Sequence, residues 1–525
     1  MAGLEARPRL VVTQTSGKLG QGLIFRPMDA KAPILAKSGH RYWIVVALIF
    51  LASTLLRWIL VFQGGQYYFS DEARYQTSQQ MTGLLLQGKI GDAGLLLFST
   101  PEHLGFKVIG IVPALLEKSF GQSLAAPAMF FSLFSVLNLY LIFLLSKRVG
   151  ASNGEALLAL MFASLSQCLF FYARHFMPYD VAMTFGLLAL YVGLADKPGI
   201  RTSVACGVLG LLCFITYNGY WTLAALGVIV HVFYKSQMVW DVLQKGIFLG
   251  LGFVLPLVAL MAASAQLRIN LLQEYRRFAG TVTQGSFEEG WTLPFAYFWH
   301  AEHFLFVLLA LLALYALLRR KDRKAVVLWG GCLLFIYLCL VLPSVFLHSF
   351  VVYGRLVRQI MPFLILLSAN GFISISQDTQ FGRTVALAAL LVVLVQAAWN
   401  FKITFSVAFP RDFVRQVQSR YTDFHFSPKR FLFGAPEICE DNGYAMQNAK
   451  YFLAAPEVAQ PVPGEILLSA SHPVNFLPYQ YEGYTPAGQQ AFRRAQLKMV
   501  FYKLNPEFAK QQDLKKIGIM SCLTK

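Results

Sequence analysis

The sequence predicts an all-α polytopic membrane protein with a small α/β domain outside the membrane at its C-terminal end. Of the 525 residues, 56% are hydrophobic and only 14% are charged. A soluble chain of this length needs more charge to cover its surface. Long apolar runs recur between residues 42 and 400, and ~20 apolar residues suffice for a helix to cross a bilayer. Because hydrocarbon offers no partners to backbone amides, these runs should be helical.

The formal net charge of +18 would fit a nucleic-acid-binding protein, but its distribution argues against that class. Lysines and arginines gather in short loops and at the ends of the apolar runs, which is the bias that keeps basic loops on the cytoplasmic side. Residues 1–41 form a basic, polar lead before a first run that is too long for a signal peptide and lacks a cleavage signature. We therefore expect a cytoplasmic N-terminal segment over residues 1–41.

The apolar runs predict about eleven transmembrane helices. The run 104–116 is treated separately, because it is short and contains Lys107. If it crossed the membrane, Lys147, Arg148 and the basic cluster at 319–324 would face outward, so we expect an interfacial helix there. The expected spans lie near residues 42–62, 125–146, 155–173, 179–195, 202–217, 219–234, 246–266, 302–318, 325–347, 356–376 and 383–400.

This topology places a long first loop, residues 63–124, and the C-terminal region, residues 401–525, on the outer side. The C-terminal region mixes helical stretches with β-like runs at 465–469, 498–504 and 516–520, between turns marked by Pro and Gly. It therefore predicts a small periplasmic α/β domain that follows the transmembrane domain at 42–400. Five of the seven cysteines fall in apolar runs, whereas Cys439 and Cys522 lie in this outer region, where their spacing alone establishes no disulfide.

Acidic residues stand at the start of the first outer loop, in the sequence Ser70-Asp71-Glu72-Ala73-Arg74-Tyr75. Physical chemistry alone favours a helix start, with Ser70 as the cap and the two carboxylates at the positive end of the helix. Their position also allows a catalytic interpretation, because both carboxylates come directly after a span, where a lipid headgroup would sit. Both interpretations remain open from the residues alone.

Two further outer segments carry charged residues. Arg174 and Asp180 lie in the loop before the span at 179–195, where Arg174 can extend to the interface and Asp180 can stand in the first turn of a helix. Arg355 and Arg358 are three residues apart and therefore share a helix face. Basic residues on the outer side run against the orientation bias, and guanidinium groups bind phosphate in a bidentate manner. We expect at least one of these two arginines to bind a lipid phosphate.

With these motifs in order, the chain resembles the GT-C superfamily of membrane glycosyltransferases. It is most similar to the branch that contains protein O-mannosyltransferases and the lipid A aminoarabinose transferase. The resemblance rests on Asp-Glu-x-Arg-Tyr in a long first outer loop, on Arg-x-x-x-x-Pro-x-Asp after the third span, and on an arginine-rich turn before a late span that contains proline. It covers roughly residues 40–400, and the C-terminal region shares only its placement.

The resemblance implies sugar transfer from a polyprenyl-phosphate donor to a lipid, glycan or protein acceptor, on the periplasmic side of the inner membrane. It implies Asp71 as the general base, Glu72 as its neighbour and Asp180 in the same cavity. The residues themselves show no Gly-rich phosphate loop and no evident metal site, so we expect neither a cofactor nor a metal. Two departures stand out: the turn at 216–220 lacks the Lys that many relatives carry, and Pro101-Glu102-His103 replaces a Pro-Pro pair. The residues expected to contact substrates are Arg74, Tyr75, His103, Arg174, Tyr353, Arg355 and Arg358.

Parts of the sequence also fit two other interpretations. A flippase or transporter of lipid-linked substrates would place ionisable residues in mid-membrane, whereas these spans are nearly free of charge, with Arg57 a partial exception. The segment His300-Ala301-Glu302-His303 could present metal ligands one helical turn apart, but a polar end of an interfacial helix explains it equally well. No Asn-x-Ser/Thr acceptor occurs in the chain, which weakly favours a bacterial membrane over the endoplasmic reticulum.

Overall fold

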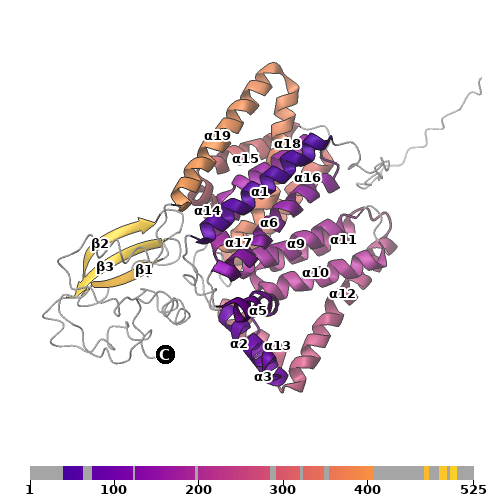
Figure 1. Ribbon diagram of the computed structural model, residues 1–525. Coiled ribbons are helices and arrows are strands. Elements are labelled where there is room, and N and C mark those ends of the chain that lie inside the picture. The colour runs from indigo at the N-terminus through magenta and orange to yellow at the C-terminus, as the bar shows by residue number, and fades with distance from the viewer. Residues whose placement is uncertain are drawn as a thin grey trace, which may run out of the picture.

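The computed structural model describes residues 39–62, 74–121, 125–195, 199–283, 291–319, 323–347 and 354–405, and three strands between 466 and 504. Up to residue 405 the described residues form helices and short connections (Figure 1). Six helical segments are long and apolar enough to cross a membrane. They are α1 (His40–Phe62), α6 (Ala125–Arg148), α12 (Val239–Gln266), α16 (Arg323–Leu347), the stretch Arg355–Gln377 that contains most of α18 (Met361–Asp378), and α19 (Gln380–Phe405).

A seventh span arises if a bent pair of helices is counted as one. The helices on either side of Ser166 meet at an angle of 67°. They and the shorter apolar helices coincide with the remaining predicted spans, so every predicted span corresponds to a helix, while the count of eleven crossings stays a prediction. The segments are α7 (Asn153–Leu165) with α8 (Gln167–Phe170) and η3 (Phe171–Arg174), α9 (Pro178–Gly193), α10 (Ile200–Thr216), α11 (Trp221–Phe233) and α15 (Phe304–Arg319).

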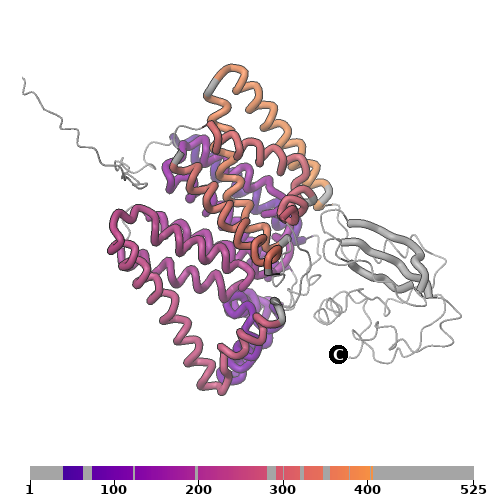
Figure 2. The backbone as a smooth tube through the Cα atoms, turned by 180° about the vertical axis from the view of Figure 1, so that it is seen from behind, coloured from indigo at the N-terminus to yellow at the C-terminus, as the bar shows by residue number. Residues whose placement is uncertain are grey.

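Shorter helices fill the connections expected on the outer side. The stretch 104–116 forms two helices of 6 and 10 residues that meet at Gly110, too short to cross a bilayer. In Figures 1 and 2, α2, α3, α5 and α13 lie together at one end of the molecule, and Phe98, Leu104 and Leu271 share an apolar cluster there. The helices are α2 (Arg74–Leu86), α3 (Ile90–Phe98), α4 (Leu104–Ile109), α5 (Ile111–Phe120), α13 (Leu271–Thr283) and α14 (Leu293–Glu302).

Burial separates the helices of the core from those that face lipid. In the most apolar part of the stretch Arg355–Gln377, 94% of the residues are buried inside the protein, against 11% in the corresponding part of α12. Large apolar side chains such as Leu255 on α12 and Leu51 on α1 are exposed, as is expected of surfaces in contact with hydrocarbon chains. The core is therefore built around α18 and α9, the two helices that follow the arginine-rich turn and the second charged loop.

Small residues let the core helices approach each other closely. A Cβ atom at Gly207 of α10 would come within 2.1 Å of the Leu249 carbonyl oxygen of α12, and one at Gly252 would come within 2.2 Å of the Val204 carbonyl oxygen. Close backbone approach at small residues is a main source of packing energy between membrane helices. These contacts fix α10, and with it the turn at 216–220, relative to its neighbours.

The C-terminal region contributes a three-stranded antiparallel sheet in the order β1-β3-β2. The predicted β-like runs 465–469 and 498–504 coincide with β1 (Ile466–Ser471) and β3 (Leu497–Leu504). The strand β2 (Tyr484–Phe492) was not predicted, and it carries a register irregularity between Pro486 and Gly488. The run 516–520, Cys439 and Cys522 lie outside the described residues, so the full α/β domain stays a prediction.

Candidate active site

The second charged loop begins where a helix breaks. Ser166 has an extended backbone conformation, with φ −70° and ψ 123°, which ends α7 and turns the chain into α8 and η3. The break frees the backbone groups of Cys168, and both are bonded to other parts of the chain. Its N–H donates to a Glu302 carboxylate oxygen at 2.7 Å, and its carbonyl oxygen accepts from Arg358 Nε at 2.7 Å. The break in the helix therefore connects two charged side chains from later segments.

Asp180 lies in the first turn of α9, two residues after Pro178 at the helix start. Proline favours this position because its missing N–H is not needed there, and the positive end of the helix dipole stabilises a carboxylate. Asn138 of α6 donates to the Asp180 carbonyl oxygen at 3.0 Å and to its carboxylate at 3.4 Å. Thr184 in turn donates to Asn138 Oδ1 at 2.8 Å. The carboxylate is thus positioned by a neighbouring span as well as by its own helix.

Arg358 forms an ion pair with Asp180. The arginine side chain is fully buried in η5 (Arg358–Ile360), and its guanidinium group lies over the Tyr172 ring, 5.3 Å from the centroid. Within the described part of the chain, its Nη1 has no hydrogen-bond partner. A buried charge of this kind requires a close counter-charge, so Asp180 and Arg358 depend on each other. The ion pair therefore joins a residue of the second charged loop to one of the arginine-rich turn.

Arg355 lies three residues earlier, in α17 (Gly354–Val357), and is only partly buried. Its Nη1 donates to the Tyr179 hydroxyl group at 2.6 Å, and its guanidinium carbon lies 5.6 Å from the centre of the same ring. The Tyr220 hydroxyl group donates to the Arg355 carbonyl oxygen at 3.1 Å. The two arginines predicted to share a face therefore contact consecutive residues of α9, and Arg355 is the more accessible of the two.

A cluster of aromatic rings surrounds this pair of arginines. Tyr179 contacts both Tyr172 and Tyr217, at centroid distances of 5.3 and 4.9 Å. Tyr217 also contacts Tyr220 at 5.2 Å and is stacked with His103 at 5.1 Å. Because aromatic faces attract cations, the rings of Tyr179 and Tyr172 stabilise the positions of the Arg355 and Arg358 guanidinium groups. His103, a predicted substrate-binding residue, is buried within it.

The first outer loop packs on the turn at 216–220 through α4. A Cβ atom at Gly105 would lie 2.3 Å from Thr216 Oγ1, so only glycine allows this approach. His103, just before α4, has a left-handed backbone with φ 59°. Lys107 in the same helix is buried and donates to the Thr100 carbonyl oxygen at 2.6 Å. Burial is the main cause that lowers the pKa of Lys107 to about 8, with Glu102 raising it and Arg74 lowering it.

Tyr75 connects the first outer loop to the second. Its ring is fully buried at the start of α2, and its centroid lies 5.1 Å from that of Phe176, four residues before Asp180. The Tyr75 hydroxyl group donates to Glu117 of α5 at 2.7 Å. Arg74 precedes it and is partly buried. Asp71, Glu72 and Tyr353 lie outside the described residues, so their predicted roles stay predictions.

Arg174, predicted to bind substrate, is buried at the end of η3 and donates from Nη2 to the Thr404 carbonyl oxygen of α19 at 3.3 Å.

The sequence interpretation did not identify the part played by Glu302, which is fully buried and accepts from Ser166 Oγ at 2.6 Å as well as from Cys168. It had considered Glu302 only as a possible metal ligand. Among the described residues, no group of three or more His, Cys, Asp or Glu could hold a metal ion. The sequence interpretation also did not predict that Tyr179, Tyr217 and Tyr220 form one aromatic cluster. The high density of tyrosines around residues 172–179 and 217–220 was a signal that could have indicated it.

No protein-family model matches the chain, and no curated protein matches it by sequence. Among solved structures it is similar to ArnT from Cupriavidus metallidurans bound to undecaprenyl phosphate, with 12% identity and a TM-score of 0.48 over 88% of this chain and 98% of that one. It is also similar to the oligosaccharyltransferase AglB from Archaeoglobus fulgidus, with 10% identity and a TM-score of 0.47 over 82% of this chain and 70% of that one. A third similar structure is the arabinofuranosyltransferase AftD from Mycobacteria, with 14% identity and a TM-score of 0.47 over 89% of this chain and 40% of that one. In each comparison the identity is 14% or less and the TM-score is below 0.5.

Proposed function

We propose that this chain is a membrane glycosyltransferase that moves a sugar from a polyprenyl-phosphate donor to a lipid, glycan or protein acceptor on the periplasmic side of the inner membrane. The observation that carries the proposal is that two arginines three residues apart have different environments. Arg358 is buried in an ion pair with Asp180, while Arg355 is partly buried and donates to the Tyr179 hydroxyl group. A fixed cation next to a second, accessible one suits a ligand with a phosphate group.

The distribution of basic residues supports an outward-facing site. The helix α9 begins at the site with Pro178, whereas the ends of other helices remote from the site carry Lys147, Arg148 and Lys235. Cytoplasmic ends of spans are rich in Lys and Arg. The C-terminal region at 401–525 follows α19, whose last turn meets Arg174 through Thr404, so the proposal also assigns that region to the periplasmic side.

In the proposed reaction the acceptor hydroxyl oxygen attacks the anomeric carbon of the sugar. The bond between that carbon and the phosphate oxygen breaks, and the polyprenyl phosphate leaves with the electron pair. Asp71 takes the proton of the acceptor hydroxyl group, a contribution of typically ~10²–10⁴-fold for a general base. Asp71 precedes Arg74, the first residue of α2, by three positions in the sequence, and Glu72 is its neighbour.

The developing charge on the phosphate needs preorganised positive groups. Arg355 is the proposed phosphate ligand, with Tyr353 and Arg174 as further substrate contacts. Asp180 and Arg358 hold the base of the site in place, and the stacked, buried rings of His103 and Tyr217 support the aromatic cluster beside the two arginines. Tyr75 and Arg74 hold the first outer loop over the second.

The test is transfer of label from a panel of radiolabelled polyprenyl-phosphate sugars, using membranes with the full-length chain and membranes that lack it. The proposal predicts label in an acceptor only where the chain is present, and the labelled product identifies the acceptor class. In sealed inverted vesicles, transfer should require permeabilisation, because the site would face the lumen. A well-folded chain that transfers no sugar from any donor, but moves a fluorescent lipid-linked sugar across the bilayer, would favour the transporter instead.

A further inference from the structure

A groove lies between α11 and α16, at the other end of these helices from the candidate active site. Its volume is about 380 Å³, which falls in the range of ligand pockets. Nearly all of its wall is apolar, and its polar groups are contributed by Tyr234, Lys235 and Lys324. The lining residues are Val149, Leu226, Ile229, Val230, Tyr234, Lys235, Lys324, Ala325, Val327, Leu328, Gly331, Cys332 and Phe335.

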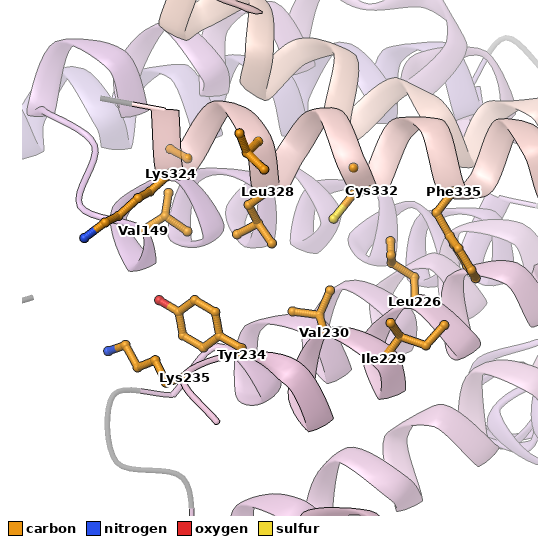
Figure 3. A pocket seen from close by; sticks show the side chains of 13 residues that line it. Val149, Leu226, Ile229, Val230, Tyr234, Lys235, Lys324, Leu328, Cys332 and Phe335 are labelled. Atoms are coloured by element: carbon orange, nitrogen blue, oxygen red, sulfur yellow. The ribbon is translucent and has the colours of Figure 1, made fainter. Parts of the chain in front are cut away.

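The polar groups of the groove gather at one mouth. Figure 3 shows the ammonium groups of Lys235 and Lys324 and the hydroxyl group of Tyr234 at the same end, with Leu226 and Phe335 at the other. Lys324 is exposed and Lys235 is partly exposed. The groove is thus amphipathic along its length, with two cations at its entrance and a hydrocarbon-like wall behind them.

Element order fixes which end of the bundle this is. The helix α11 starts near the candidate site, where Thr222 donates to Gln359 at 2.8 Å, and it ends at Phe233, next to Tyr234 and Lys235. The helix α16 runs the other way and begins at Arg323, so its first unpaired backbone N–H groups and the positive end of its dipole lie at the lysine mouth.

The backbone at Lys235 adds a second indication. Lys235 has φ 55°, in the left-handed region, at the position directly after the last residue that caps α11. Glycine is the usual residue at that position because a side chain there is strained. A lysine here accepts that strain and places its ammonium group at the mouth of the groove, 5.4 Å from the centre of the Tyr234 ring.

We propose that this groove binds an anionic phospholipid of the membrane, with one acyl chain along α11 and α16 and its phosphate between Lys235 and Lys324. Basic pockets between transmembrane helices on the cytoplasmic side favour anionic headgroups. Other lysines and arginines lie at the same end of the bundle, since Lys147 and Arg148 close α6 and Lys245 donates to the Tyr234 carbonyl oxygen at 2.7 Å. The proposal does not depend on the glycosyltransferase function.

The test is native mass spectrometry of the detergent-purified full-length chain, titrated with phosphatidylglycerol or with phosphatidylcholine of the same acyl chains. The chain should bind phosphatidylglycerol about tenfold more tightly. The double variant Lys235→Gln/Lys324→Gln should lose that preference. The matched control, Lys118→Gln/Lys402→Gln, removes the same charge from two exposed lysines outside the groove and should keep it.

A second variant tests the acyl chain. Gly331 lines the groove, and a Cβ atom there meets nothing within 4 Å, so the side chain of Gly331→Leu starts in open space and should occupy part of the groove. It should lower the affinity for both lipids while the protein still elutes as a folded species. Equal affinity of the intact chain for both lipids, equal losses in the control variant, or unchanged lipid binding by Gly331→Leu would overturn the proposal. Displacement of the lipid by inorganic phosphate at low millimolar concentration would show a phosphate site without an acyl-chain groove, and would overturn it as well.

Discussion

Asp180 and Arg358 lie 178 residues apart in the chain and form a buried ion pair between the first turn of α9 and the turn before α18. Each is also bonded to a third element, Asp180 to Asn138 of α6 and Arg358 to the Cys168 carbonyl oxygen in the broken span. The pair therefore joins four segments at the point where the two charged outer segments meet. Its integrity should decide whether the rest of the site is formed.

Breaking this pair should destabilise the protein. Removing one partner of a buried pair leaves an uncompensated charge, which typically costs about 3–5 kcal/mol. We expect Asp180→Asn and Arg358→Gln each to lower the unfolding temperature of the purified protein markedly. The double variant Asp180→Leu/Arg358→Met should recover much of the loss, because it leaves no buried charge. Single variants as stable as the intact chain would show that the pair is unimportant.

Arg355 should act on donor binding and not on folding. Hydrogen bonds to charged groups contribute about 1.5–3 kcal/mol, and ~1.4 kcal/mol corresponds to a factor of ten. Arg355→Gln should therefore raise KM for the polyprenyl-phosphate donor by roughly ten- to a hundredfold. Tyr179→Phe removes the hydrogen bond between the two side chains but leaves the cation, so it should change KM much less. Equal effects of the two variants in steady-state kinetics would assign Arg355 a structural role.

Glu302 should support the broken span that holds Arg358. It accepts from Ser166 Oγ and Cys168 N, and both donors would lose a buried partner in Glu302→Leu. Each unsatisfied buried group costs about 1–3 kcal/mol, so thermal unfolding should shift clearly downward, and activity should fall with it. The control is Glu274→Leu, which removes only a pair with the exposed Arg277 and should change stability by about 0.5 kcal/mol or less. A Glu302 variant as stable as this control would contradict the assignment.

Lys107 should make stability depend on pH. Its pKa is about 8 in the folded protein and 10.5 as the reference for the unfolded chain, mainly because of burial. Between these values the unfolded chain binds more protons, so the free energy of unfolding should rise as pH increases from 8 to 10.5. Thermal unfolding measured over this range should lose that rise in Lys107→Met. Lys118→Met, at an exposed position in α5, should retain it, and an unchanged slope in Lys107→Met would refute the assignment.

Periodicity and composition predicted the elements of the fold well. Each apolar run that predicted a span coincides with a helix or a bent pair of helices. The Asp180 carboxylate was also correctly predicted to lie in the first turn of a helix. The choice of partners could not be predicted in this way, because Asp180, Arg358 and Glu302 meet across long sequence separations that only the packing of the helices determines. The spacing of Arg355 and Arg358 predicted a shared helix face. It could not indicate that Arg358 would be buried in an ion pair with Asp180 while Arg355 stayed partly exposed.

The most direct test of the proposed function is sugar transfer by the Asp71→Asn variant. Asparagine keeps the size of the side chain but cannot accept the acceptor's proton. Membranes with the intact chain should transfer label from a polyprenyl-phosphate sugar, and Asp71→Asn should fall by ~10²–10⁴-fold, towards the background of membranes without the chain. The variant should still elute as a folded protein. Transfer by Asp71→Asn at the rate of the intact chain would contradict the assignment of Asp71 as the general base.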